Sequence, residues 1–193
     1  MKFFYICNAL NFRAFLLYML KVRDKEFKLY LSAEELKDRV NQIGAQLSQD
    51  YAGKEPVVLG VLNGAFMFLS DLMKAVDTPL EMSFIKISSY ESMSSTGKVK
   101  EVLGLTGSLA GRHVLVVEDI VDTGLSMAYL INELKAQAPS SVEVVSLLLK
   151  PEALTAAVSV KYVGFEIPNK FVVGYGLDYD GYGRNLKEIY QLK

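Results

Sequence analysis

Short runs of consecutive apolar residues recur along the chain, separated by segments with a helical apolar period. Such runs are typical of strands that a sheet buries on both faces. Four of them are PVVLGVL from Pro56, HVLVVEDI from His113, VEVVSLLLK from Val142 and KYVGFEI from Lys161. Two further segments are also predicted to be strands, LEMSFIKISSY from Leu80 and FVVGYGLD from Phe171.

The segments between these runs carry helical signals. Ser32 and Glu35 form the S-x-x-E pattern of a capping box. Apolar residues then follow at helical spacing, at Leu36, Val40, Ile43 and Leu47. A second helix is predicted over AFMFLSDLMKAV, and a third has an apolar face made of Met127, Leu130, Ile131 and Leu134. Buried strands that alternate with helices predict an α/β fold with a doubly wound, mostly parallel sheet flanked by helices.

Composition narrows the class of protein. The 193 residues are 51% hydrophobic and 22% charged, which is ordinary for a globular protein, and we expect one domain over residues 1–193. The formal net charge of -1 gives no basic field for nucleic acid. The lone Cys7 excludes an internal disulfide framework and favours a reducing, cytoplasmic location. The lone His113 excludes a histidine-rich metal site.

The N-terminal stretch MKFFYICNALNFRAFLLYML is apolar and begins with a lysine, so a signal peptide has to be considered. Asn8, Asn11 and Arg13 interrupt the apolar run, and no small-x-small cleavage site follows. The stretch is also too broken for a membrane-spanning helix. We therefore interpret residues 1–18 as an extension without a functional role, with secretion as the alternative, and we expect no membrane association.

The candidate chemistry lies in VLVVEDIVDTGLS, from Val114 to Ser126. Glu118, Asp119 and Asp122 lie within or just after a strongly apolar run, although acidic side chains are rarely buried unless they are paired or bound. Ligands of open α/β sheets bind outside the carboxyl ends of the strands. The three acids are therefore predicted to lie at the mouth of a cleft.

The turn after this strand has the features of a phosphate site. Gly124 allows close approach of the backbone, Thr123 and Ser126 carry hydroxyl donors, and the following helix offers free N–H groups. An acid pair beside a phosphate suggests recognition of ribose hydroxyls, or of Mg²⁺ through water. The alternative is a helix cap on Asp122 or Thr123 with solvated acids at the strand end.

Two other phosphate motifs fit less well. STGKV at residues 95–99 partly matches a Walker A loop, but that loop needs glycine at the position of Ser92 and a hydroxyl residue at the position of Val99. VLVVED also resembles the first strand of a response-regulator receiver domain. That domain needs a phosphoacceptor aspartate after a later strand, where this chain offers Lys150 and Glu166.

The whole stretch VLVVEDIVDTGLS resembles the phosphoribosyl pyrophosphate (PRPP) motif of the type I phosphoribosyltransferases. VLNGAFMFLSDL, SSYESMSSTGKVK and GFEIPNKFVVGYGLDYDGYGRNL resemble the hypoxanthine-guanine branch of that family, so the similarity extends from about Pro56 to the C-terminus. The resemblance implies the family fold, with a small hood and a mobile active-site loop. It also implies a purine-salvage enzyme that uses PRPP and Mg²⁺, converts hypoxanthine and probably guanine to IMP and GMP with release of pyrophosphate, and forms a dimer or tetramer.

The resemblance implies roles on the PRPP side of the site. Glu118 and Asp119 would bind the ribose hydroxyls and, with Asp178, the metal. Asp122 would also be the general acid/base that acts on the imidazole ring of the purine. The 5′-phosphate would be held by Asp122, Thr123, Gly124, Leu125 and Ser126.

The resemblance also implies which residues contact the purine and the pyrophosphate. Lys150 would donate to the 6-oxo group, Phe171 would stack on the purine, and the backbone of Val172 would contact its pyrimidine edge. The residues implied for pyrophosphate and for the lid are Asn63, Gly64, Arg184, Ser89 and Tyr90.

One residue departs from the family pattern. The loop after the first core strand usually carries Lys or Arg between Leu and Gly, and often a non-proline cis peptide, whereas this chain has Leu62-Asn63-Gly64. Asparagine keeps a neutral donor but lacks the cation. Two alternatives also remain open: a xanthine-preferring relative, and a regulator with the same fold that binds nucleotides or RNA without turnover.

Overall fold

The computed structural model describes residues 19–88, 100–101 and 107–193. The predictions for the extension at residues 1–18, for Ser89 and Tyr90, and for the rest of the active-site loop lie outside the described residues. The chain divides into two compact units, which we call the small unit (Met1–Leu36 with Lys170–Lys193) and the large unit (Lys37–Asn169).

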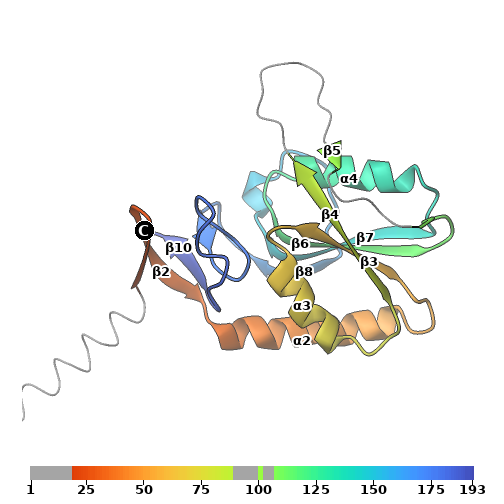
Figure 1. Cartoon of the computed structure of the whole chain (residues 1–193), viewed down its shortest axis with the longest axis horizontal. Helices are drawn as coiled ribbons and strands as arrows, with labels where there is room; N and C mark the ends of the chain where they lie inside the picture. The colour runs from red at the N-terminus through yellow and green to blue at the C-terminus, as the bar shows by residue number, and fades with distance from the viewer. Residues whose placement is uncertain (1–18, 89–99, 102–106) are drawn as a thin grey trace, which may run out of the picture. The chain divides into compact units, whose positions relative to one another are not determined.

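The large unit is built on a six-stranded sheet in the order β5-β4-β3-β6-β7-β8 (Figure 1). Its strands are β3 (Val57–Leu62), β4 (Glu81–Ser88), β5 (Lys100–Glu101), β6 (His113–Val121), β7 (Ser141–Leu149) and β8 (Tyr162–Glu166). Each neighbouring pair among β4, β3, β6, β7 and β8 is parallel, and β5 pairs antiparallel with the end of β4. The predicted α/β fold with a mostly parallel sheet is confirmed.

Within the described residues, three α-helices accompany the sheet, α2 (Ala33–Asp50), α3 (Phe66–Ala75) and α4 (Leu125–Lys135), together with a short 3₁₀ helix, η1 (Pro151–Ala153). The predicted capping box begins α2. The Glu35 N–H donates to Ser32 Oγ at 3.3 Å, and the Ser32 N–H donates to Glu35 Oε2 at 2.8 Å. These two bonds satisfy backbone donors that the first turn of a helix leaves unpaired.

The large unit buries both faces of its sheet. Figure 1 shows α4 on one side of the strands and α2 and α3 on the other. One core cluster joins alternate residues of β3 and β6 to the inner face of α4, and it includes Val57, Leu59, Val61, Val114, Val116, Met127, Leu130 and Leu134. Val58 and Leu115 point to the opposite face and are also buried. Burial on both faces explains why these strands are continuous apolar runs.

The small unit contains a four-stranded antiparallel sheet in the order β1-β2-β10-β9. Its strands are β1 (Met19–Val22), β2 (Lys25–Leu31), β9 (Val172–Val173) and β10 (Ile189–Leu192). The hairpin of β1 and β2 was not predicted from the sequence. The strand predicted over FVVGYGLD is wrong beyond β9, because the chain turns at Gly174 and Gly176, where φ is 106° and 103°.

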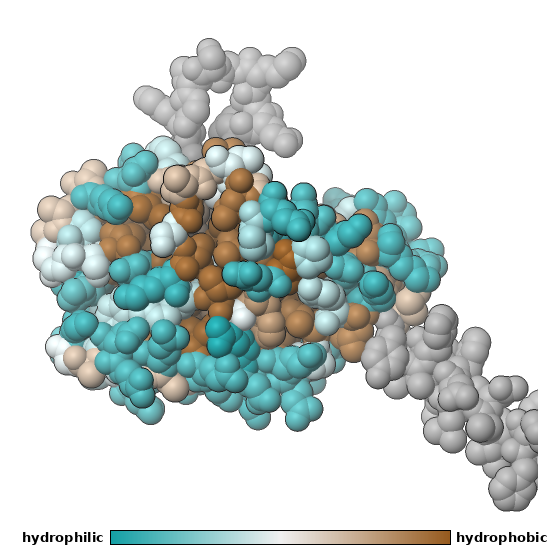
Figure 2. All heavy atoms as spheres, turned by 180° about the vertical axis from the view of Figure 1, so that it is seen from behind, coloured by the Kyte–Doolittle hydropathy of each residue, from teal (hydrophilic) through white to brown (hydrophobic). Residues whose placement is uncertain are grey.

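Apolar side chains also reach the surface of the large unit. Phe66, Met82 and Leu125 are exposed, whereas Phe68, Leu69 and other residues of the same elements are buried. Figure 2 shows apolar residues at the surface of one face of the molecule, with hydrophilic residues around them. Across residues 19–88, 100–101 and 107–193, no helix is long and apolar enough to cross a membrane.

Candidate active site

Three parallel neighbours, β3, β6 and β7, end at the same edge of the sheet of the large unit. Asn63 follows the end of β3, Asp122 follows β6, and Lys150 follows β7. Because the carboxyl ends of parallel strands meet at one edge, these residues lie at the position where α/β sheets bind their ligands. The structure therefore brings together the large-unit residues that the sequence singled out on β3, β6 and β7.

The acid pair lies near the end of β6. Asp119 is buried at 8% exposure, and the Ile120 N–H donates to its Oδ1 at 2.8 Å. Glu118 is partly buried, and this burial raises the pKa of its carboxyl well above the usual value. The hydrogen bond and the negative charge of Asp119 raise the pKa of Glu118 further. Two adjacent carboxylates in such a place favour a bound cation or hydroxyl groups.

Gly64 contacts the acid pair from the loop that follows the neighbouring strand β3. A Cβ atom at position 64 would overlap Oδ2 and Cγ of Asp119 and would lie 3.0 Å from its Oδ1. The peptide bond between Leu62 and Asn63 is cis, as the family resemblance suggested. Asn63 itself is exposed. The position of the Asp119 carboxylate therefore requires a residue without a side chain in the loop after β3.

Asp122 and Lys150 form an ion pair. Lys150 Nζ lies 2.6 Å from Asp122 Oδ2, and the side chains are 8% and 46% exposed, respectively. The Lys150 N–H also donates to the carbonyl oxygen of Val121 at 3.0 Å. A buried ammonium needs a charged or strongly polar partner, and Asp122 provides it here. The sequence had assigned these residues separate roles and had not predicted their contact.

The phosphate loop, which we define as residues 122–126, leads directly into α4. Gly124 has φ 78° and immediately precedes the helix. The first helical hydrogen bond runs from the Ala128 N–H to the carbonyl oxygen of Gly124. As at any helix start, the N–H groups of the first turn have no acceptor within the helix, so they form a region suited to an anion. Leu125 is 61% exposed, and its N–H donates to Thr123 Oγ1 at 3.5 Å.

The predicted purine contacts belong to the small unit. Phe171 is 44% exposed, and its ring centroid lies 6.3 Å from that of Phe27 and 5.8 Å from that of Tyr179. Val172 is buried in β9. An aromatic ring with one exposed face is suited to stacking, but the roles of Phe171 and Val172 remain predictions.

Asp178 and Arg184 contact each other within the small unit. Arg184 Nη2 lies 2.6 Å from Asp178 Oδ1, and Arg184 Nη1 donates to the carbonyl oxygen of Gly176 at 2.7 Å. The Gly181 N–H donates to Asp178 Oδ2 at 2.7 Å. Both oxygens of Asp178 therefore have partners in their own loop. Within the part of the chain that the structure describes, no three His, Cys, Asp or Glu side chains form a group suited to a metal ion.

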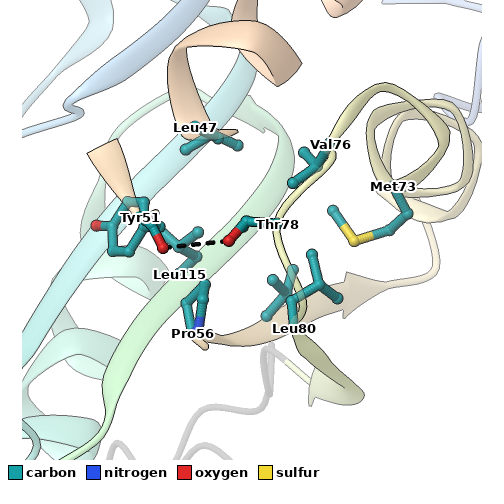
Figure 3. A pocket seen from close by; sticks show the side chains of 9 residues that line it. Leu47, Tyr51, Pro56, Met73, Val76, Thr78, Leu80 and Leu115 are labelled. Atoms are coloured by element: carbon teal, nitrogen blue, oxygen red, sulfur yellow. Dashed lines mark hydrogen bonds between the residues drawn. The ribbon is translucent and has the colours of Figure 1, made fainter. Parts of the chain in front are cut away.

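A pocket in the large unit lies away from these residues (Figure 3). Its lining comes from α2, α3 and the amino-terminal ends of the strands, and includes Leu47, Tyr51, Pro56, Met73, Val76, Thr78, Leu80 and Leu115. Pro56 and Leu80 immediately precede β3 and β4. The pocket is thus at the edge of the sheet opposite to the phosphate loop, and we do not assign it to the candidate site.

Residues 28–180 match the family model of the phosphoribosyl transferase domain. The chain belongs to the phosphoribosyltransferase family. A hypoxanthine-guanine phosphoribosyltransferase of Bacillus subtilis is 44% identical to this chain over 167 residues, which cover 86% of this chain and 93% of that protein. The crystal structure of a hypoxanthine phosphoribosyltransferase from Staphylococcus aureus has a TM-score of 0.82 at 42% identity, covering 86% of this chain and 91% of that one.

A longer protein is also similar to this chain. The "Bifunctional protein TilS/HprT" of Listeria innocua is 45% identical over 167 residues. These residues make up 86% of this chain but only 26% of the bifunctional protein, so the chain spans about a quarter of that relative. Together, these relatives confirm the hypoxanthine-guanine branch that the motifs indicated.

Proposed function

We propose that this chain transfers the 5-phosphoribosyl group from PRPP to a 6-oxopurine, hypoxanthine or guanine, and releases pyrophosphate. The proposal rests above all on the ion pair between Lys150 and Asp122, the first residue of the phosphate loop, because this pair places a donor and a proton acceptor at an anion site. The names of the relatives support the same reaction.

Lys150 and Asp122 account for the choice and activation of the base. The ammonium of Lys150 donates to an oxygen acceptor such as the 6-oxo group, and it repels the donor of a 6-amino group. The ionised Asp122 accepts the imidazole proton of the purine. In this step the bond between C1 of the ribose and a ring nitrogen of the purine forms, while the bond from C1 to the pyrophosphate oxygen breaks.

The phosphate loop and the acid pair account for binding of PRPP. The N–H groups at the start of α4 receive the 5′-phosphate, and the hydroxyls of Thr123 and Ser126 add donors. Glu118 and Asp119 accept hydrogen bonds from the ribose hydroxyls. Their carboxylate oxygens are also ligands that Mg²⁺ prefers. Because Gly64 has no side chain, the Asp119 carboxylate can occupy the space beside it.

The implied Mg²⁺ would supply positive charge that stabilises the leaving pyrophosphate. Glu118 and Asp119 are the side chains of the large unit that fit it. Asp178 fits less directly, because both of its oxygens already have partners. Each of these oxygens keeps a second lone pair, so Asp178 can hold the metal while Arg184 contacts it. The exposed Asn63, in the loop after β3, would offer the leaving pyrophosphate one neutral hydrogen-bond donor.

The test is an assay of the purified protein with PRPP, Mg²⁺ and each of hypoxanthine, guanine, xanthine and adenine, followed by chromatography of the nucleotides. We expect IMP and GMP. Formation of XMP with a higher kcat/KM than IMP or GMP would favour the xanthine-preferring alternative. PRPP binding without any nucleotide product would favour the regulator.

Three further properties remain our proposals, the first of them from the family resemblance and the other two from the composition. We infer a homodimer or homotetramer, which light scattering on the purified protein tests. We infer a cytoplasmic location from the lone Cys7, and no binding of nucleic acid from the net charge of -1.

A further inference from the structure

The segment that follows β7 contacts the phosphate loop. We call residues 151–158 the bracket segment. The N–H groups of Thr155 and Ala156 donate to the carbonyl oxygen of Thr123 at 3.0 and 3.1 Å. The hydroxyl of Thr155 donates to the same oxygen at 3.3 Å. A carbonyl oxygen has two lone pairs, so these three donors use its full capacity as an acceptor.

The bracket segment also packs against the turn of the phosphate loop. A Cβ atom at Gly124 would lie 3.2 Å from Leu154 Cδ2 and 3.3 Å from Val158 Cγ2. Leu154 and Val158 are partly buried and pack against the core cluster that contains α4. The segment is therefore fixed in the core on one side and lies against the glycine of the phosphate loop on the other.

Backbone hydrogen bonds also connect the bracket segment to Lys150 and to the residues beside Asp122. Lys150, which immediately precedes the bracket segment, donates its N–H to Val121 at the end of β6, and the Ala153 N–H donates back to the carbonyl oxygen of Lys150 at 3.1 Å. The loops after β6 and β7 are thus bonded on both sides of Asp122. This bonding gives the phosphate loop a fixed position relative to the side chain of Lys150.

The carbonyl of Thr123 matters for electrostatic reasons. An anion site made of backbone N–H groups works only if neighbouring carbonyl oxygens point elsewhere, because their partial negative charge repels the anion. Three donors from the bracket segment hold this oxygen toward residues 155 and 156. The N–H groups of the following helical turn are then left to face a phosphate.

We propose that Thr155 is a positioning residue for the phosphate site, acting through the carbonyl of Thr123 without touching the substrate. The proposal rests on the proposed function, since it takes the 5′-phosphate as the ligand of the phosphate loop. Neither the PRPP motif nor the purine motifs include Thr155. Of the three donors to the Thr123 carbonyl oxygen, two are the backbone N–H groups of Thr155 and Ala156, which no sequence motif records.

Three substitutions separate the contributions of Thr155. Thr155→Ser keeps the hydroxyl and the N–H, Thr155→Val removes the hydroxyl, and Thr155→Pro removes both. Leu154 has φ -61° and ψ 123°, which is the conformation that a residue before proline prefers, so the proline variant does not disturb Leu154. The probe is ribose 5-phosphate, and its dissociation constant is measured by calorimetric titration, with pyrophosphate as a second ligand.

The expected changes follow the number of donors removed. Binding of ribose 5-phosphate should be unchanged in Thr155→Ser, about twofold weaker in Thr155→Val, and about tenfold weaker in Thr155→Pro. Pyrophosphate binding should stay within about twofold of wild type in all three, since its predicted contacts lie elsewhere. In the assay, the KM for PRPP should rise in the same order, while kcat and the KM for the purine change little.

Thr78 offers a matched control. Its hydroxyl donates to the carbonyl oxygen of Tyr51 at 3.3 Å, as the dashed line in Figure 3 shows. This is the same bond at the same length as that of Thr155, but at the opposite edge of the sheet. Thr78→Val should lower the melting temperature about as much as Thr155→Val and leave ribose 5-phosphate binding unchanged.

Two results would overturn the proposal: wild-type affinity for ribose 5-phosphate in Thr155→Pro, or equal weakening in Thr78→Val and Thr155→Val. If the proline variant does not fold, the difference between Thr155→Val and the wild type decides, because valine has the shape of threonine and replaces only its hydroxyl by a methyl group. The proposed function fails separately. A wild-type protein that binds ribose 5-phosphate but forms no nucleotide removes the reaction, and the order of the Thr155 variants still tests the role of the bracket segment.

Discussion

Replacing Gly64 by alanine tests whether the loop after β3 sets the position of the acid pair. The added methyl group would overlap Oδ2 and Cγ of Asp119. Asp119 is only 8% exposed, and its Oδ1 accepts a hydrogen bond from the Ile120 N–H. The carboxylate therefore has to rotate away and lose this bond, or the loop has to move away from the acid pair. Either movement disrupts the site.

The expected loss of affinity can be estimated from the contact that is disturbed. To relieve an overlap of this kind, the two groups have to separate by roughly 1 Å or more. Such a shift takes a carboxylate out of good hydrogen-bonding geometry. A hydrogen bond to a charged group contributes about 1.5–3 kcal/mol, so the loss of one weakens PRPP binding by about 10- to 150-fold. Stability should change less, because the far end of a side chain gives way more easily than backbone.

The assay is a calorimetric titration with PRPP at fixed Mg²⁺, together with a thermal melt of each protein. Gly60→Ala is the matched control, because Gly60 lies in the same strand as the residues that lead to the loop. A Cβ atom there would overlap Leu69 Cδ2 and lie 3.2 Å from Phe84 Cδ1, all within the core. We expect that variant to lose about 1–3 kcal/mol of stability and to bind PRPP as wild type does.

The two variants should therefore give opposite patterns. Gly64→Ala should bind PRPP poorly with a small change in melting temperature, and Gly60→Ala should melt earlier with normal binding. If Gly64→Ala binds PRPP within twofold of wild type, the reasoning is refuted. Asp119 would then either tolerate the methyl group in place or have no part in binding ribose.

Three further predictions concern chemistry. Asp122→Asn keeps the shape of the phosphate loop but removes the proton acceptor, so kcat should fall by about 10²–10⁴-fold with little change in PRPP affinity, and near-normal turnover would contradict the assignment. Adenine should give no useful rate of AMP formation, because the 6-amino group offers Lys150 a donor where it needs an acceptor; efficient AMP formation would overturn the substrate class. Asn63→Lys should tighten pyrophosphate binding about fivefold, measured as product inhibition at fixed Mg²⁺ and ionic strength. An unchanged inhibition constant would show that position 63 does not face the leaving group.

Local sequence determined the elements of the large unit and the character of its phosphate loop. The capping box at Ser32 and Glu35 formed because both partners lie within one helical turn. The apolar runs of β3, β6 and β7 became buried parallel strands because no other element buries both faces of so short a segment. The order of Asp122, Thr123 and Gly124 before a helix was likewise enough to predict an anion site.

Local sequence predicted less in the small unit. FVVGYGLD has the apolar composition of a strand, yet only Val172 and Val173 pair as β9. Gly174 ends the pairing, because a Cβ there would overlap the carbonyl oxygen of Glu188 and only glycine allows that approach. The hairpin of β1 and β2 was missed because β2 pairs with β10, at the other end of the chain.

Only the tertiary structure decided which groups meet at the site. Gly64 lies in the loop after β3 and Asp119 in the neighbouring strand β6, and Lys150 reaches Asp122 across 28 positions in the sequence. Thr155 acts on Thr123 across 32 positions, partly through a backbone N–H group that every residue except proline carries. A sequence motif records side chains and local spacing, so it predicts a phosphate ligand for residues 122–126 but not the groups around them. The groups that hold the loop in place come from distant parts of the chain, and only folding brings them together.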